Sequence, residues 1–108
     1  MAVDNPILEL ALDPQAKVPI GVGWSRWLPA GVTIDSATWS LDGLVNETQS
    51  INASETTDEA GVTHPAGTLA IVWISGIQAG QSYDCTVHIV ASDGREDDRT
   101  IRVVGKER

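Results

Sequence analysis

The feature that most constrains the fold is a short alternation of polar and apolar residues, broken by turn-forming residues about every ten positions. Gly, Pro, Asn and Asp-Gly pairs supply these breaks, and β-branched residues fill the segments between them. A helical period is hard to find anywhere along the chain. Strands of this length with this spacing are typical of a β-sandwich or barrel. We therefore predict an all-β chain of about seven short strands.

The expected strands follow from this alternation. They are residues 7–12 (a strand or one turn of helix), 17–24, 32–41, 68–74, 82–91 and 98–104, with one or two short strands within 44–64. Pro19 has no amide donor, which predicts an edge strand. Asp42-Gly43 and Asp93-Gly94 are hairpin signals. We expect the apolar run 68–74 to be buried on both faces.

The length limits the chain to one domain. A chain of 108 residues and 11.5 kDa fits a single domain and leaves no room for two. Within it, residues 1–13 are expected to be an N-terminal arm or first strand, and residues 44–66 a long polar excursion. The start of the chain lacks a secretory pattern. The longest apolar run, 69–74, is too short to cross a membrane. We expect a soluble protein made in a reducing cytoplasm.

The segment around Tyr83 narrows the fold. Ile77 precedes Tyr83 by six positions with a glycine between them, which is the spacing of the tyrosine corner of immunoglobulin-like (Ig-like) sandwiches. Cys85 follows two positions later, without a second cysteine for a disulfide, and Trp39 stands where such sandwiches bury a tryptophan. The prediction is an Ig-like antiparallel β-sandwich. Its expected core anchors are Trp39, Trp73, Ile77, Tyr83 and Cys85.

The sequence contains no clear pattern for catalysis, metal binding or cofactor binding. A serine hydrolase needs a nucleophile beside a histidine and a carboxylate, and neither His64 nor His88 stands in such a pattern. The acidic segment 93–98 lacks the spacing of a calcium loop, and Arg95 and Arg99 favour internal pairing with its carboxylates over a metal site. No phosphate-binding loop or cofactor motif is present. We expect no enzyme activity, no cofactor and no metal.

The charge and the tryptophan content of the chain indicate which kinds of binding partner to expect. The net charge of −8 argues against a nucleic-acid partner, because that role needs clustered Lys and Arg. There are four Trp, one Tyr and no Phe. On an extended segment Trp24 and Trp27 point to opposite faces, so one is expected to be buried. The other lies across a sheet edge or at a contact surface, where Trp and Arg are enriched.

Several motifs together resemble one protein family. They are Asp13-Pro14, Trp24-Ser25 with Trp27-Leu28, Thr33-Ile34, Thr38-Trp39, Val72 to Gly76, Ala79-Gly80 with Tyr83, Asp93 to Arg95, and Asp98 to Ile101. Over about residues 13–104 the chain resembles the bacteriophage fiber–tail adaptor proteins, which are small Ig-like virion proteins. It departs from them in its longer polar middle, 44–66, and at Gly23, where the family often has Asp.

The resemblance implies a structural component of a bacteriophage virion that joins a fiber or other appendage to the tail or neck. Its implied partners are other virion proteins, in many copies of a symmetric assembly put together in the host cytoplasm. The expected contact residues are Trp24, Arg26, Trp27, Arg95 and Arg99. The alternatives are a capsid decoration (cement) protein and a carbohydrate-binding Ig-like module. The expected burial of Trp39 and Trp73 disfavours a sugar platform.

Overall fold

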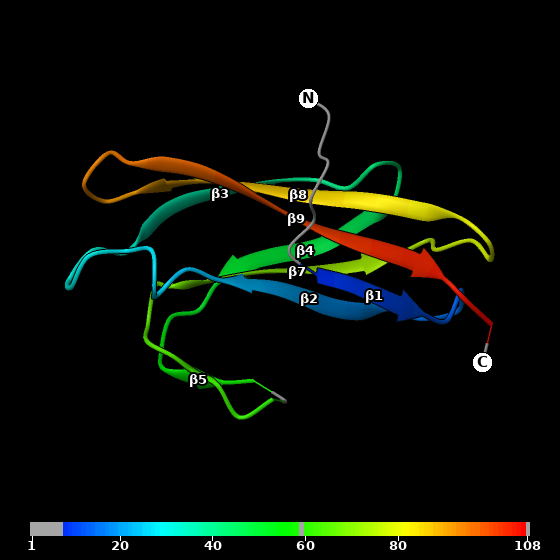
Figure 1. Ribbon diagram of the computed structural model, residues 1–108, viewed down its shortest axis with the longest axis horizontal. Helices are drawn as coiled ribbons and strands as arrows, with labels where there is room; N and C mark the ends of the chain where they lie inside the picture. Colours follow the sequence, from blue (N-terminus) through cyan, green and yellow to red (C-terminus); the bar gives the residue numbers. More distant parts are fainter. Residues whose placement is uncertain (1–7, 59, 108) are drawn as a thin grey trace.

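The computed structural model describes residues 8–58 and 60–107 of the chain. These residues form nine strands joined by turns and loops, and no helix (Figure 1). The strands are β1 (Leu8–Leu12), β2 (Val18–Gly23), β3 (Ile34–Ser40), β4 (Val45–Ile51), β5 (Thr56–Thr57), β6 (Thr63–His64), β7 (Leu69–Ser75), β8 (Ser82–Ala91) and β9 (Glu96–Gly105). The expected all-β class is confirmed. Residues 8–12 are a strand and not a helical turn, and the earlier residues of the expected arm lie outside the described residues. None of the described segments is a helix able to span a membrane.

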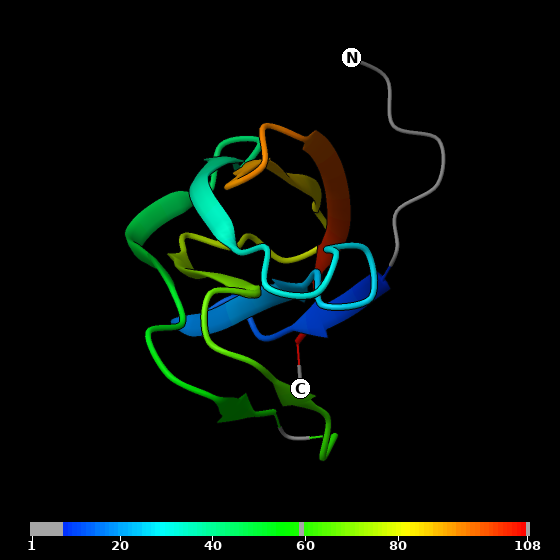
Figure 2. The same cartoon turned by 90° about the vertical axis from the view of Figure 1, so that its left-hand side faces the viewer.

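Two sheets pack face to face as a β-sandwich. One has the strand order β1-β9-β8-β3 and the other the order β2-β7-β4, while β5 and β6 form a separate small hairpin. All pairs are antiparallel except β1 with β9, which is parallel. These orders correspond to the C-F-G and B-E-D neighbours of immunoglobulin constant-type domains. Figure 2 views the sandwich from the end where the connection 24–33 lies, with the small hairpin projecting from the body.

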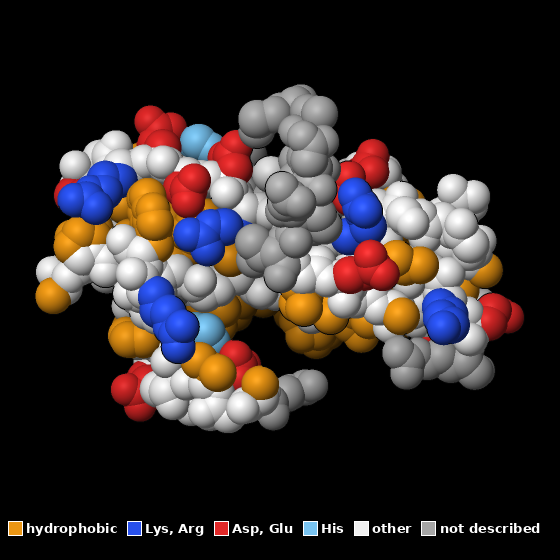
Figure 3. Space-filling model, in the orientation of Figure 1, with side chains coloured by type: hydrophobic (Ala, Val, Ile, Leu, Met, Phe, Trp, Pro, Cys, Tyr) orange, Lys and Arg blue, Asp and Glu red, His pale blue; other side chains and the backbone are white. Residues whose placement is uncertain are grey.

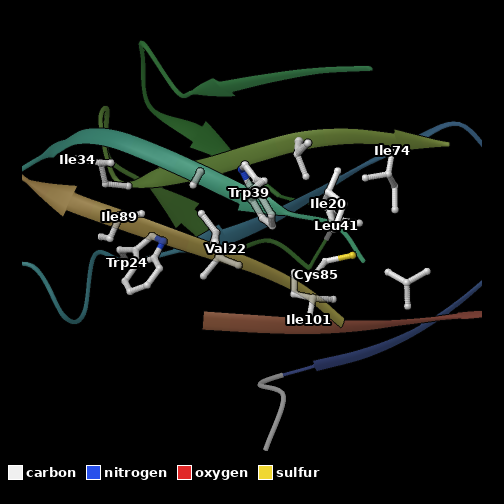
Figure 4. Packing of buried hydrophobic residues seen from close by; sticks show 14 of the residues in the cluster. Ile20, Val22, Trp24, Ile34, Trp39, Leu41, Ile74, Cys85, Ile89 and Ile101 are labelled. Carbon is white, nitrogen blue, oxygen red and sulfur yellow. The ribbon is translucent and has the colours of Figure 1, made fainter. Parts of the chain in front are cut away.

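Alternation along the strands places one face of each sheet in the core. In β8, Cys85, Val87 and Ile89 are buried, while the residues between them face outward. Ile20 and Val22 of β2 point inward from the other sheet, and Figure 4 shows them beside Trp39 and Cys85. Since side chains of a strand alternate between its two faces, this pattern fixes the pairing register of the buried strands.

The tyrosine corner is present. The Tyr83 hydroxyl accepts a hydrogen bond from the Gln78 amide at 3.0 Å, across the connection from β7 to β8. The end of β9 closes the corner, because the Gly80 amide donates to the Gly105 carbonyl at 2.9 Å. A Cβ atom on Gly105 would lie 2.0 Å from the Gln78 carbonyl oxygen, so only glycine fits there. Ile77 is buried beside this corner and Tyr83 is partly buried.

Burial keeps the Cys85 thiol in its unreactive, protonated form. Its side chain is fully buried, and it is a free cysteine. Burial, with a smaller contribution from the charges of Asp42 and Asp84, raises the pKa of the thiol to about 12. The thiolate is the reactive form of cysteine, so Cys85 acts as a small hydrophobic residue at neutral pH.

The Asp42-Gly43 turn does not make a hairpin. Both residues have positive φ, 56° and 101°, and the Leu44 amide donates to the Leu41 carbonyl at 3.1 Å, so the turn itself forms. However, β3 pairs with β8 and β4 pairs with β7. The turn therefore carries the chain from one sheet to the other. Local sequence chemistry predicted the turn correctly and its strand partners wrongly.

The expectation that 68–74 is buried on both faces is also wrong, and with it the core position of Trp73. Val72 and Ile74 of β7 face the core, whereas Trp73 is 41% exposed on the outer face of the sheet. That strand is the middle one of three, and its outer face meets solvent at Trp73. An apolar run in a central strand thus does not establish burial on both sides.

Paired polar side chains cover the outer face of β8 and β9. Asp84 accepts from Arg102 at 2.9 Å, and the hydroxyls of Thr86 and Thr100 are 2.8 Å apart. Further along, the His88 ring nitrogens contact Asp98 and Glu96. The hydrogen bonds that His88 makes to Asp98, the larger cause, and to Glu96 raise the pKa of His88 above its ordinary value. Such cross-strand pairs stabilise a sheet and hold its register.

This pair of contacts predicts a pH dependence of stability. A histidine whose pKa is raised on folding contributes stability that is complete below its unfolded pKa, about 6.5, and is lost as pH rises through the folded-state pKa. We expect the free energy of unfolding of the natural protein to fall with rising pH relative to that of His88→Gln. Urea titrations from roughly pH 5.5 to 9 measure the difference. Parallel profiles for the two proteins would contradict the assignment.

Candidate contact surface at one end of the sandwich

The segment after β2 turns sharply, which corrects the expectation for its two tryptophans. The amides of Trp27 and Leu28 both donate to the Trp24 carbonyl at 2.9 Å, so residues 24–28 form one helix-like turn. In such a turn, residues three apart lie on the same side. The rings of Trp24 and Trp27 accordingly meet edge to face, 5.7 Å between centroids and 71° between planes. The assumed extended segment, with its rings on opposite faces, is wrong.

Trp24 lies inside the protein and not at a contact surface. Its side chain is fully buried in the core (Figure 4). The guanidinium carbon of Arg99 lies 4.7 Å from the centroid of its ring, a cation–π distance. Trp24 is therefore excluded as a direct contact residue, and Trp27, which is partly buried, covers its edge.

The three expected arginines differ in how they are held. Arg99, besides stacking on Trp24, pairs with Asp97 at 3.4 Å. Arg95 pairs with Asp93 at 3.1 Å in the turn between β8 and β9. Arg26 is exposed and has no ion pair within the described part of the chain. Arg26 is thus the most available of these cations for a partner.

Two residues that sequence reasoning had not linked, His64 and Gly23, complete this end. His64 Nε2 contacts Asp58 Oδ2 at 2.9 Å, and the His64 side chain is only 10% exposed. A Cβ atom on Gly23 would lie 2.5 Å from the His64 ring. Position 23 therefore needs glycine to admit the His64 ring. The Nδ1 atom of His64 is buried without a hydrogen-bond partner.

Asn52 holds the excursion in place, and sequence analysis gave no sign of this role. Its buried side-chain amide donates to the carbonyls of Ser54, His64 and Pro65 at 2.9–3.3 Å. Its Oδ1 atom accepts from the amides of Thr68 at 3.1 Å and Leu69 at 2.9 Å. One side chain thus joins both ends of the segment 52–68 and carries the β5–β6 hairpin that bears Asp58 and His64.

These pieces enclose a surface groove of about 360 Å³. Its lining residues are Gly23, Ser25, Arg26, Trp27, Asp58, Val62, His64 and Arg99. Figure 3 shows Lys and Arg side chains spaced along this end of the molecule, above the projecting hairpin. We call this the Arg–Trp groove. It brings together three of the five expected contact residues, while Trp24 lies beneath it and Arg95 sits in the β8–β9 turn.

The described residues show no arrangement for metal chemistry. No group of three or more His, Cys, Asp or Glu able to hold a metal ion is found among residues 8–58 and 60–107. In the acidic segment 93–98, Asp93 and Asp97 pair with arginines, and Glu96 and Asp98 contact His88. The described chain is thus a small β-sandwich whose most distinctive surface is a groove lined by arginine and tryptophan.

Comparison with known proteins identifies the family. Residues 12–104 match the family model described as Podophage GP4 fiber-tail adaptor protein gp77. The chain belongs to this family. A search of curated proteins found no match. The resemblance drawn from the sequence motifs is therefore confirmed, over nearly the same residues.

The role of Asn52 gives a stability prediction. Replacing Asn52 with Ala removes the side-chain acceptor of the buried Leu69 amide and the donor to the Ser54, His64 and Pro65 carbonyls, at a cost of about 1–3 kcal/mol in the free energy of unfolding. The matched control is Asn46→Ala, which removes only an exposed hydrogen bond to Gln49 at 2.9 Å and should change it by less than about 0.5 kcal/mol. Urea unfolding measures both. Equal effects of the two substitutions would contradict this role of Asn52.

Proposed function

We propose that this chain is a structural part of a bacteriophage virion that connects a fiber or other appendage to the tail or neck. The family match over residues 12–104 is the observation that carries the proposal. The described sandwich supports it: strands and paired polar side chains give a rigid body, and the Arg–Trp groove gives that body a contact end. We further propose that the sandwich is Ig-like, since its strand orders and its tyrosine corner agree with that fold.

The same reasoning favours a binding role over catalysis. His64 is engaged with Asp58, His88 is engaged with Asp98 and Glu96, and burial keeps Cys85 protonated. We propose that the chain is not an enzyme and uses no cofactor. Adaptors in a symmetric particle act in several copies, which repeats one contact around the axis. Its place is then the virion, assembled in the cytoplasm of the host.

One argument against the carbohydrate-binding alternative no longer holds. It depended on the burial of Trp73, and Trp73 is 41% exposed. What favours the adaptor over a carbohydrate-binding module or a capsid decoration protein is the family match and the Arg–Trp groove. Trp73 lies on β7, outside the residues that line that groove.

Charge reversal at Arg26 tests the proposed contact. Arg26 is exposed and unpaired among the described residues, so Arg26→Glu leaves the fold intact and places repulsion at the contact. A hot-spot loss of about 2 kcal/mol weakens the attachment roughly 30-fold. We expect a large drop in the fraction of phage particles that carry the appendage, counted by electron microscopy.

The matched control is Lys106→Glu, which makes the same charge change at an exposed lysine that lies outside the groove. It should leave appendage occupancy unchanged. Particles of Arg26→Glu with full occupancy would show that Arg26 is not at the attachment contact. Arg99 is unsuited to this test, because its removal also uncovers the ring of Trp24.

A further inference from the structure

The outer edge of β2 presents unpaired backbone groups. In the order β2-β7-β4, β2 pairs only with β7 among the described residues. The Trp24 amide bonds to the Thr68 carbonyl at 2.8 Å, in line with the unbroken antiparallel register of β2 and β7. Because bonded pairs alternate along such a ladder, Val22 and Ile20 also bond to β7. Pro19, Gly21 and Gly23 therefore direct their backbone groups away from the sheet.

A largely apolar groove of about 560 Å³ lies along this edge. β1 forms one side with Leu8 and Leu10, and the β5–β6 hairpin forms the other with Thr57 and His64. Leu8 is 48% exposed on its rim. Figure 3 shows the recess between the body and the projecting hairpin, with hydrophobic side chains at its margin. The strand at the opposite edge of the same sheet, β4, is mostly polar and exposed.

The apolar groove continues into the Arg–Trp groove. Gly23, Asp58 and His64 line both of them. A segment lying along β2 from Pro19 to Gly23 is thus led on to Arg26 and Arg99. Asp58 contacts His64 and Asp97 pairs with Arg99, so Arg26 is the cation of that end that has no ion pair among the described residues, in a chain whose net charge is −8. Charge complementarity at this end calls for an acidic side chain.

We propose that the joined grooves bind one extended segment of a different virion subunit by strand addition to β2. The segment's backbone pairs with the outward-facing backbone groups of Gly21 and Gly23. Its apolar side chains, at alternate positions, lie along the apolar groove, and an acidic side chain meets Arg26. The inference rests on the proposed adaptor function and names the kind of contact that the adaptor makes.

The shape of the site favours a single segment over a second copy of this chain. The open edge lies between β1 and the β5–β6 hairpin, so two β2 edges cannot meet directly across a two-fold axis. Pro19 withholds one amide donor from either kind of pairing and does not distinguish them. A single strand entering from another protein does not meet the obstacle of the two flanking elements.

Hydrogen exchange on the isolated full-length chain tests the mode of binding. The probe is the acetylated peptide Asp-Asp-Val-Thr-Val-Thr-Val, followed by NMR. We expect the exchange of the Gly21 and Gly23 amides to slow at least about tenfold on binding, because they gain carbonyl partners. The Val22 amide, already bonded to β7, is the internal control and should not change. Unchanged exchange at Gly21 and Gly23 at millimolar peptide would overturn the proposal.

Two variants test the acidic end. Arg26→Glu should weaken binding of the peptide about tenfold. Lys106→Glu, the control, should leave it unchanged, and a peptide with Lys-Lys in place of Asp-Asp should bind less tightly to the natural chain. Equal affinity of the Asp and Lys peptides, or no effect of Arg26→Glu, contradicts the proposed charge recognition.

Photo-crosslinking in assembled particles identifies the occupant. A benzoylphenylalanine residue replaces the exposed, groove-lining Thr57, with the same residue at exposed Thr38 on β3 as control. We expect Thr57 alone to crosslink to a segment of a different virion protein. Crosslinks within this chain, to another copy of it, or to nothing would overturn the proposal. The adaptor function fails separately, if particles without this chain keep their appendages.

Discussion

The side chain of Asn52 is the contact on which the candidate site depends. It binds backbone groups at both ends of the segment 52–68, through three donor and two acceptor contacts. A polar excursion with two very short strands has little apolar surface with which to hold itself to the body. The buried amide replaces that missing packing. It places His64 against Gly23, and by doing so it forms one side of both grooves.

The other side of the site depends on a sharp turn. The turn at 24–28 buries Trp24, brings Trp27 against it and allows Arg99 to stack on its ring. The cation that closes the core thereby also lines the surface groove, so stability and recognition share a residue at Arg99. Arg26 carries no such double role. That difference makes Arg26 the residue whose change reports on contact alone.

Much of the fold was predictable from sequence, because strand alternation and the tyrosine-corner spacing are local signals. The position of β8 and the bond from Gln78 to Tyr83 followed from such signals. Two of the errors have a common cause, since each required knowledge of distant partners. Asp42-Gly43 turns the chain but passes it to the other sheet, and Trp73 lies on a face that remains open to solvent. The turn at 24–28 is apparent only from the backbone hydrogen bonds of the structure. The sequence analysis assumed an extended segment there, and its prediction for the two tryptophans was therefore wrong.

The candidate site was predictable only in part. Arg26, Trp27 and Arg99 were identified from residue type and family motifs, and the structure brings them to one groove. Asn52, His64 and Gly23 were not connected, because they act through contacts across 12 and more positions.

A reconstruction of the intact phage particle tests the central claim most directly. The account predicts density for this sandwich between the appendage and the tail or neck; density on the head surface, or none in the particle, would contradict it.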